Sequence, residues 1–291
     1  MAHAHSNQVV VRLLGDFQIG FDDDVNICWR SKKCTNLLAL LLIDHDRLVS
    51  RERLERALWP RPEQPAGPTA LKVVVHTLRR ALDTAFGPDR DFLHIESGEG
   101  AYQLRLGERV RVDIHEFERL CRQGSEAEWH GSVQTAVDNY GRAAEIYRGD
   151  FLARRGEEWV CEHREWLRAK MMHALTALVQ HASDIDDAPA AVRHARRMLE
   201  LDPTAERAFQ AMILIHGRRA ELEQAKYWYE LCAARLEREL DTAPQEETRR
   251  LLLRAHNGDL ISSTDARRIH SRGCSGAHWT VERETSSPAA R

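Results

Sequence analysis

The chain has 291 residues, of which 43% are hydrophobic and 30% are charged, and this composition is typical of soluble globular proteins. This length predicts two or three domains rather than one compact fold. No apolar run approaches the roughly 18 residues of a membrane span and the first residues lack the apolar core of a secretory signal, so we expect no membrane association and a cytoplasmic protein. The six cysteines form no CxxC pair, which predicts reduced thiols and neither a disulfide framework nor a zinc site.

The net charge of −3 is unevenly distributed along the chain. Residues 1–111 hold 16 Lys and Arg against 15 Asp and Glu, residues 112–257 hold 21 against 26, and residues 258–291 hold 5 against 4. The first third therefore has a net charge of +1 and the middle has a net charge of −5. This distribution permits nucleic-acid binding only through a local cationic surface.

The first third of the chain alternates between strand and helix patterns. Residues 9–14, 18–21 and 25–29 have the composition of short strands joined by turns. Ser31 and Ser50 each precede a helical pattern and have the side chain that caps a helix, which predicts helices over 31–42 and 50–59. Residues 60–68 contain four prolines and a glycine and are expected to form a loop.

A third helix is predicted over residues 69–85. One face is apolar, with Leu71, Val74, Val75, Leu78 and Leu82 at helical spacing. The other face is cationic, with Lys72, His76, Arg79 and Arg80. Residues 92–96 and 102–106 then alternate as strands around a glycine-containing turn, which predicts a β-hairpin.

Beyond residue 112 the strand patterns disappear and helices are predicted throughout. Their ranges are 113–123, 132–148, 157–182, 188–200, 204–217, 220–240 and 245–256. Ala191 and Ala225 occupy similar segments 34 residues apart, which is the tetratricopeptide (TPR) period, and a third such segment around Ala136 lies out of register. The expected fold is an α+β winged helix-turn-helix domain followed by an all-α TPR-like helical domain.

The expected domain boundaries follow from these patterns. We expect a disordered N-terminus at 1–8, a winged-helix DNA-binding domain at 9–111, a helical domain at 112–257 and a flexible tail at 258–291.

Motifs for catalysis and for metal or cofactor binding are lacking. Residues 15–20 have the glycine spacing of a phosphate-binding loop, but Phe21-Asp22 stands where a lysine and a hydroxyl residue are required. Cys161 and His163 supply only two potential metal ligands, and there is no GxSxG motif. We therefore expect no enzyme activity, no catalytic residues, no metal and no cofactor.

The order of strands, two helices, a loop, a cationic helix and a hairpin is that of a winged helix. In a winged helix bound to DNA, the third helix lies in the major groove, and the hairpin touches the neighbouring backbone or minor groove. In this interpretation Tyr102, Leu104 and Leu106 are expected to face the core, and the alternative for Tyr102 is an approach to the sugar-phosphate backbone. The candidate DNA-binding residues are Lys72, His76, Thr77, Arg79 and Arg80 on the helix, and Gln103 and Arg105 facing outward on the hairpin.

A simpler interpretation is that Arg79 and Arg80 only solvate an amphipathic helix. Residues 71–82 contain three cations and no Asp or Glu, in a chain that is slightly acidic overall. This local excess of positive charge favours the DNA-binding interpretation.

Several of these segments together resemble a known family. They include VRLLGDFQI at 11–19, VSRERLERALWP at 49–60, YRGDFL at 147–152 and LDPTAE at 201–206. In this order they are similar to the antibiotic-regulatory-protein (SARP) type of bacterial activator, in which an OmpR-like winged helix precedes a bacterial transcriptional activation domain. The chain differs where it has Ala101 before Tyr102, a position usually occupied by glycine in the family.

The resemblance implies a sequence-specific transcriptional activator. Its expected partners are double-stranded promoter DNA, with direct repeats near the −35 element, and RNA polymerase through a sigma factor or another subunit. Self-association on the tandem repeats and a nucleoid-associated cytoplasmic location are expected as well. The alternative is a TPR-like adaptor whose winged-helix half is a structural or protein-binding module.

Overall fold

The fold is described from a computed structural model, which divides into two compact units, one ending at Asp186 and the other beginning at Asp187. The structure describes residues 8–21, 31–45, 47–60, 67, 69–87 and 92–260. The predicted strand at 25–29, most of the predicted loop, residues 1–7 and residues 261–291 lie outside these ranges.

The first unit opens with a small sheet in which β1 is the middle strand. β1 (Val9–Arg12) pairs antiparallel with β2 (Gln18–Phe21) and parallel with β6 (Val110–Val112). The alternating Val9 and Val11 are fully buried. The first two strands confirm the prediction, whereas the sequence did not predict β6.

Helices α1 (Lys32–Ile43) and α2 (Arg51–Leu58) begin where the capping serines predicted. The Oγ atoms of Ser31 and Ser50 accept hydrogen bonds from the backbone N–H groups of Cys34 and Arg53. α2 stops before Pro60, which cannot continue a helix.

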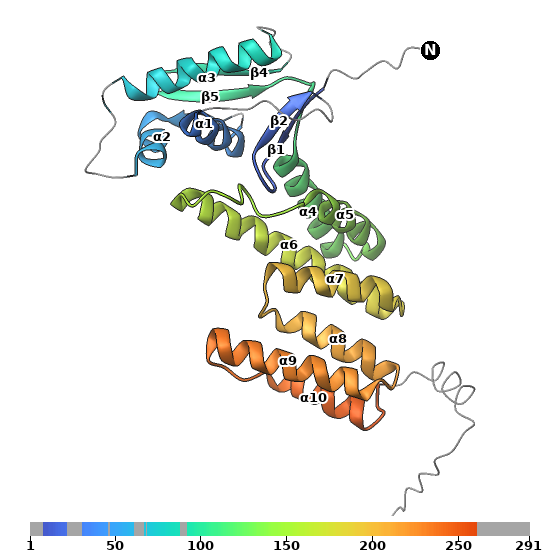
Figure 1. The fold of residues 1–291 in the computed structure, drawn as a ribbon. Helices are drawn as coiled ribbons and strands as arrows, with labels where there is room; N and C mark the ends of the chain where they lie inside the picture. The colour runs from blue at the N-terminus through green and yellow to red at the C-terminus, as the bar shows by residue number, and fades with distance from the viewer. Residues whose placement is uncertain are drawn as a thin grey trace, which may run out of the picture. The chain divides into compact units, whose positions relative to one another are not determined.

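Helix α3 (Ala70–Phe86) packs against α1 and a second sheet of order β3-β5-β4. This sheet consists of β3 (Val49–Ser50), β4 (Leu93–Gly98) and β5 (Ala101–Leu106), and the last two form the predicted hairpin. Figure 1 shows α3 lying along β4 and β5. Gly100 in the hairpin turn has a φ of +70°, so the left-handed conformation of this turn falls on a glycine and not on Ala101. The winged-helix fold is thereby confirmed.

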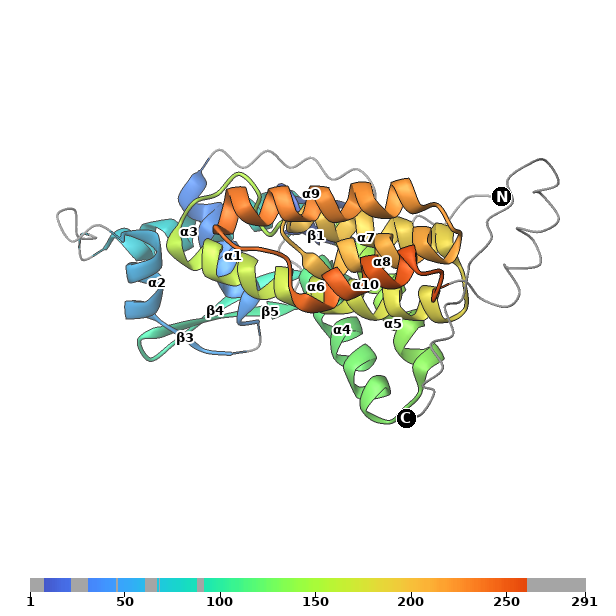
Figure 2. The same ribbon diagram turned by 90° about the horizontal axis from the view of Figure 1, so that it is seen from below.

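Three further helices complete the first unit: α4 (Asp113–Trp129), α5 (Val133–Ile146) and α6 (Glu158–Asp184). α4 and α5 form an antiparallel pair that Figure 2 shows from below. At the start of α4, the Asp113 carboxylate accepts hydrogen bonds of 2.9 Å from the backbone N–H groups of Leu13 and Leu14 after β1. This carboxylate therefore joins the small sheet to α4.

The segment between α5 and α6 is also attached to the winged helix. Leu152 N–H donates to the carbonyl of Leu13, and Gly15 N–H donates to the carbonyl of Asp150, each at 2.9 Å. Arg164 of α6 holds the same segment by donating to the carbonyls of Phe151 and Leu152 at 3.0 and 2.9 Å. The segment therefore pairs with residues 13–15, which connect β1 to β2.

A third attachment lies at the start of α6. One oxygen of Glu157 is 2.9 Å from both Lys32 Nζ and Asn36 Nδ2, which belong to α1. Through these attachments the boundary expected at residues 111 and 112 falls inside the first compact unit.

The described part of the second unit contains two successive helix pairs, α7 (Ala188–Leu201) with α8 (Glu206–Arg218), and α9 (Leu222–Leu240) with α10 (Glu246–His256). Ala191 and Ala225 are fully buried at matching places in the first helix of each pair. The TPR-like repeat is therefore present in these helices. Within the described part of the chain, no helix is long and apolar enough to cross a membrane.

Candidate nucleic-acid interface

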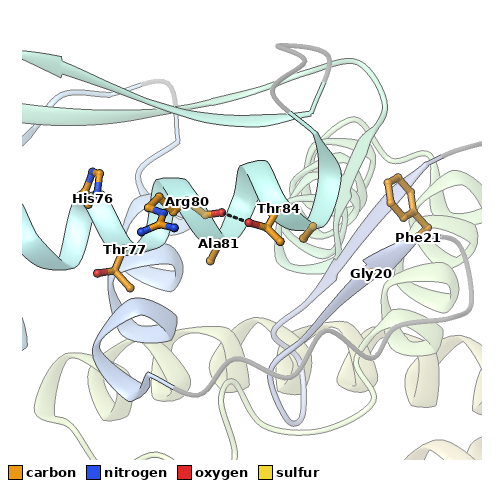
Figure 3. Close-up of a pocket in the computed structure, with 8 residues that line it drawn as sticks. Gly20, Phe21, His76, Thr77, Arg80, Ala81 and Thr84 are labelled. Carbon is orange, nitrogen blue, oxygen red and sulfur yellow. Dashed lines mark hydrogen bonds between the residues drawn. The ribbon is translucent and has the colours of Figure 1, made fainter.

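The outward face of α3 is set by the stripe that α3 buries. Leu71, Val75, Leu78 and Leu82 are nearly inaccessible to solvent and recur at i, i+4, i+7 and i+11. Residues two positions further along the helix are rotated by about 200°, so they lie opposite this stripe. The central residues of the outward face are therefore Val73, Thr77, Arg80 and Thr84, all of them exposed. Figure 3 shows the last three along successive turns, with His76 beside them.

This outward face is positively charged. Lys72, His76 and Arg80 are exposed, and none of them forms an ion pair with a carboxylate among the described residues. The first acid on the helix is Asp83, near its C-terminal end. The structure thus brings together Lys72, His76, Thr77 and Arg80, four of the seven predicted residues, on one accessible helix face.

Arg79 occupies a different environment from Arg80. Its guanidinium donates from Nε and Nη2 to the carbonyl of Ile95 at 3.1 and 2.8 Å, and from Nη2 to Ser97 Oγ at 2.6 Å. β4 is an edge strand, and Arg79 supplies donors to a carbonyl that no neighbouring strand reaches. Arg79 therefore attaches the hairpin to α3, a role that the sequence pattern did not distinguish from that of Arg80.

The hairpin differs from the prediction at Gln103. We expected Gln103 to face outward with Arg105, but this residue is only 7% exposed, so the expectation is wrong. The reason is that β5 is the middle strand, so residues of both β3 and β4 flank its outer face. Arg105 is accessible, with its Nε 3.2 Å from Glu96 Oε2 on the adjacent strand.

Two features of α3 were missed by the sequence reasoning. Val73 is 60% exposed at the centre of the outward face. Its distance of two residues from Val75 in the buried stripe was the signal that could have identified it. In addition, a cleft at the C-terminal end of the outward face is lined by His76, Thr77 and Arg80 together with Gly20 and Phe21 of β2 (Figure 3).

The arrangement presents a long helix with one cationic face, attached to a β-hairpin, in a unit that continues into helices. An α-helix of this kind fits the major groove of B-DNA, which is about 12 Å wide. A winged helix followed by helix-pair repeats defines the class of the protein, a two-part transcriptional regulator.

Comparison with known families supports this class. The family described as "Transcriptional regulatory protein, C terminal" matches residues 28–104, and the family described as "Bacterial transcriptional activator domain" matches residues 112–254. MoaR1, a transcriptional regulatory protein of Mycobacterium bovis and Mycobacterium tuberculosis, is 24% identical over 250 residues, which cover 83% of this chain and 78% of MoaR1. The regulatory protein DnrI of Streptomyces peucetius is 26% identical over 127 residues, covering 42% of this chain and 46% of DnrI. The chain belongs to the SARP type of bacterial transcriptional regulators.

The fold is shared with a solved structure, Mycobacterium tuberculosis EmbR in complex with a low-affinity phosphopeptide. The TM-score is 0.70 at 21% sequence identity, and the match covers 91% of this chain and 71% of EmbR. The likeness extends over both halves of the chain and confirms the order of winged helix and helical domain.

Proposed function

We propose that this regulator is a sequence-specific DNA-binding activator whose α3 enters the major groove of promoter DNA. The observation that carries the proposal is the outward face of α3, where Lys72, His76, Thr77 and Arg80 are exposed without a carboxylate among them. Arg80 and Lys72 are suited to phosphates or to guanine, and His76 and Thr77, which lie between them along the helix, are suited to hydrogen bonds with base edges. The remaining predicted residue on the helix, Arg79, positions the β4–β5 hairpin, which is the wing of this fold.

The hairpin is proposed to lie beside the DNA backbone. The side chain of Arg105 is accessible, and in the proposal it exchanges its contact with Glu96 for one with a phosphate. We leave Gln103 out of the interface because its side chain is buried.

The helical half is proposed to contact proteins rather than DNA. Residues 112–257 have a net charge of −5, which opposes binding to phosphates, and stacked helix pairs present extended surfaces. In the proposal, two copies bind direct repeats near the −35 element, and this half joins the copies and recruits RNA polymerase through a sigma factor or another subunit. Joining two copies raises their effective concentration on tandem sites. The protein would accordingly be found on the nucleoid.

A mobility-shift assay of the full chain on its own upstream region tests the proposal. We expect a retarded complex that survives an excess of unrelated competitor DNA. Arg80→Ala should weaken this complex by about 1–3 kcal/mol, while Arg196→Ala, which removes an exposed arginine of α7, should leave it unchanged. The absence of any competitor-resistant complex would favour the adaptor alternative, in which the winged helix is a structural or protein-binding module.

A further inference from the structure

Towards its N-terminal end, the centre line of the outward face of α3 is apolar at Val73, whereas Arg80 on the same line and Lys72 beside it are cationic. Val73 is 60% exposed, while Lys72, the residue before it, and His76, three positions after it, are exposed and polar. A single exposed valine is ordinary on a protein surface. Val73 is distinguished by its position, because it lies opposite the buried stripe and therefore where the helix approaches a groove most closely.

The threonines of this face add to its apolar character. Thr77 Oγ1 donates a hydrogen bond of 2.8 Å to the carbonyl of Val73, and Thr84 Oγ1 donates one of 2.7 Å to the carbonyl of Arg80. Each hydroxyl hydrogen is thereby committed to the helix backbone. Thr77 retains a methyl group and an acceptor oxygen, so one turn beyond Val73 the outward surface also carries a methyl.

We propose that Val73 and the methyl group of Thr77 recognise thymine by contact with its C5-methyl group. This inference rests on the proposed function, since it requires α3 to lie in the major groove. Thymine is the one base that presents a methyl there, and aliphatic and threonine methyl groups are suited to contact it. Lys72 and Arg80 on either side then hold phosphates or a guanine, and the apolar pair distinguishes thymine from cytosine.

The test begins with the full-length protein and a pool of duplexes carrying a randomised segment. Selection should enrich a site that contains thymines, and each thymine of that site is then replaced in turn by uracil. Uracil differs from thymine only by lacking the methyl group. At one or two positions we expect affinity to fall about fourfold, as follows from burying one methyl-sized group at about 0.8 kcal/mol.

Substitutions assign these positions to side chains. Val73→Ala should abolish the difference between thymine and uracil at one position. Thr77→Ser, which keeps the hydroxyl and removes the methyl, should do so at the neighbouring position, whereas Thr77→Val, which keeps a methyl and removes the hydroxyl, should preserve the difference. Val133→Ala serves as the matched control, because Val133 is a 57% exposed valine on α5. Circular dichroism melting curves verify that all variants fold.

The outcomes separate the two proposals. If the pool yields an enriched site but uracil is tolerated at every thymine within twofold, or if Val73→Ala and Thr77→Ser discriminate as wild type does, the thymine contact is overturned. If the full chain enriches no sequence at all, the proposed function itself fails. Loss of discrimination in Val73→Ala but not in Val133→Ala supports the inference.

Discussion

Arg79 and Arg80 are adjacent in sequence, and the structure predicts opposite consequences for their replacement. Arg79→Ala removes a guanidinium that donates two hydrogen bonds to the Ile95 carbonyl and one to Ser97 Oγ. Hydrogen bonds from charged groups contribute roughly 1.5–3 kcal/mol each when buried, and partial exposure of Arg79 reduces this. We expect a loss of about 2 kcal/mol for the set.

This loss should be visible as thermal destabilisation. For a unit of this size, about 2 kcal/mol corresponds to a fall in Tm of roughly 4–8 °C. Arg80→Ala should change Tm little, because Arg80 is exposed and forms no ion pair with a described carboxylate. Arg79→Lys should recover only part of the stability, since a lysine cannot reproduce the fork that contacts two acceptors.

The assay combines thermal unfolding followed by circular dichroism with mobility shifts normalised to the folded fraction. We expect Arg79→Ala to lower Tm and to weaken DNA binding less than Arg80→Ala does. The reasoning is refuted if Arg79→Ala melts like the wild type and loses as much specific affinity as Arg80→Ala. That result would place Arg79 on the bases rather than on the hairpin.

Four further predictions concern the attachment of the winged helix, the packing of the helices and the wing. Burial raises the pKa of Asp113 to about 6, so its contribution to stability is full below about pH 4 and is lost as the pH rises through 6. Asp113→Asn should remove this pH-dependent decrease, which is roughly 3 kcal/mol in the free energy of unfolding measured with urea. An unchanged pH profile would show that Asp113 does not cause the decrease. Burial favours the neutral form of Glu157, but hydrogen bonds from α1 outweigh it and lower its pKa to about 2. Glu157→Gln should therefore destabilise by about 1 kcal/mol at pH 7 and progressively less as the pH falls below 4, whereas equal destabilisation at pH 7 and 3 would exclude an ionic contribution. A Cβ atom at Gly124 would overlap the ring of the buried Tyr140, so Gly124→Ala should cost about 1–3 kcal/mol, and a neutral effect on Tm would show that the ring can move aside. Arg105→Ala should reduce the log–log salt slope of DNA binding by about one if Arg105 meets a phosphate, and an unchanged slope would remove it from the interface.

Local signals in the sequence were sufficient for most helices. Ser31 and Ser50 marked two helix starts because a capping hydroxyl acts within three residues of its own position. The apolar spacing of α3 and the 34-residue interval between Ala191 and Ala225 were readable for the same reason, since both are periodic along the chain.

Features that depend on distant pairing could not be predicted in this way. β6 has only three residues, and its parallel partner β1 lies about a hundred positions earlier, so no local pattern marks it. The burial of Gln103 follows from the position of β5 between two strands, which an alternating pattern does not reveal. The difference between Arg79 and Arg80 arises from the place of Ile95 on an edge strand, which sequence spacing does not encode.

The central claim is that the outward face of α3 binds a specific DNA sequence. A footprint titration of the full chain on its own upstream region, with excess competitor DNA, tests this claim most directly. We predict that the wild type and Arg196→Ala protect a discrete direct repeat, and that a folded Lys72→Ala, Arg80→Ala double variant protects none at the same concentration. Equal protection by the double variant, or no protected site with the wild type, would contradict the account.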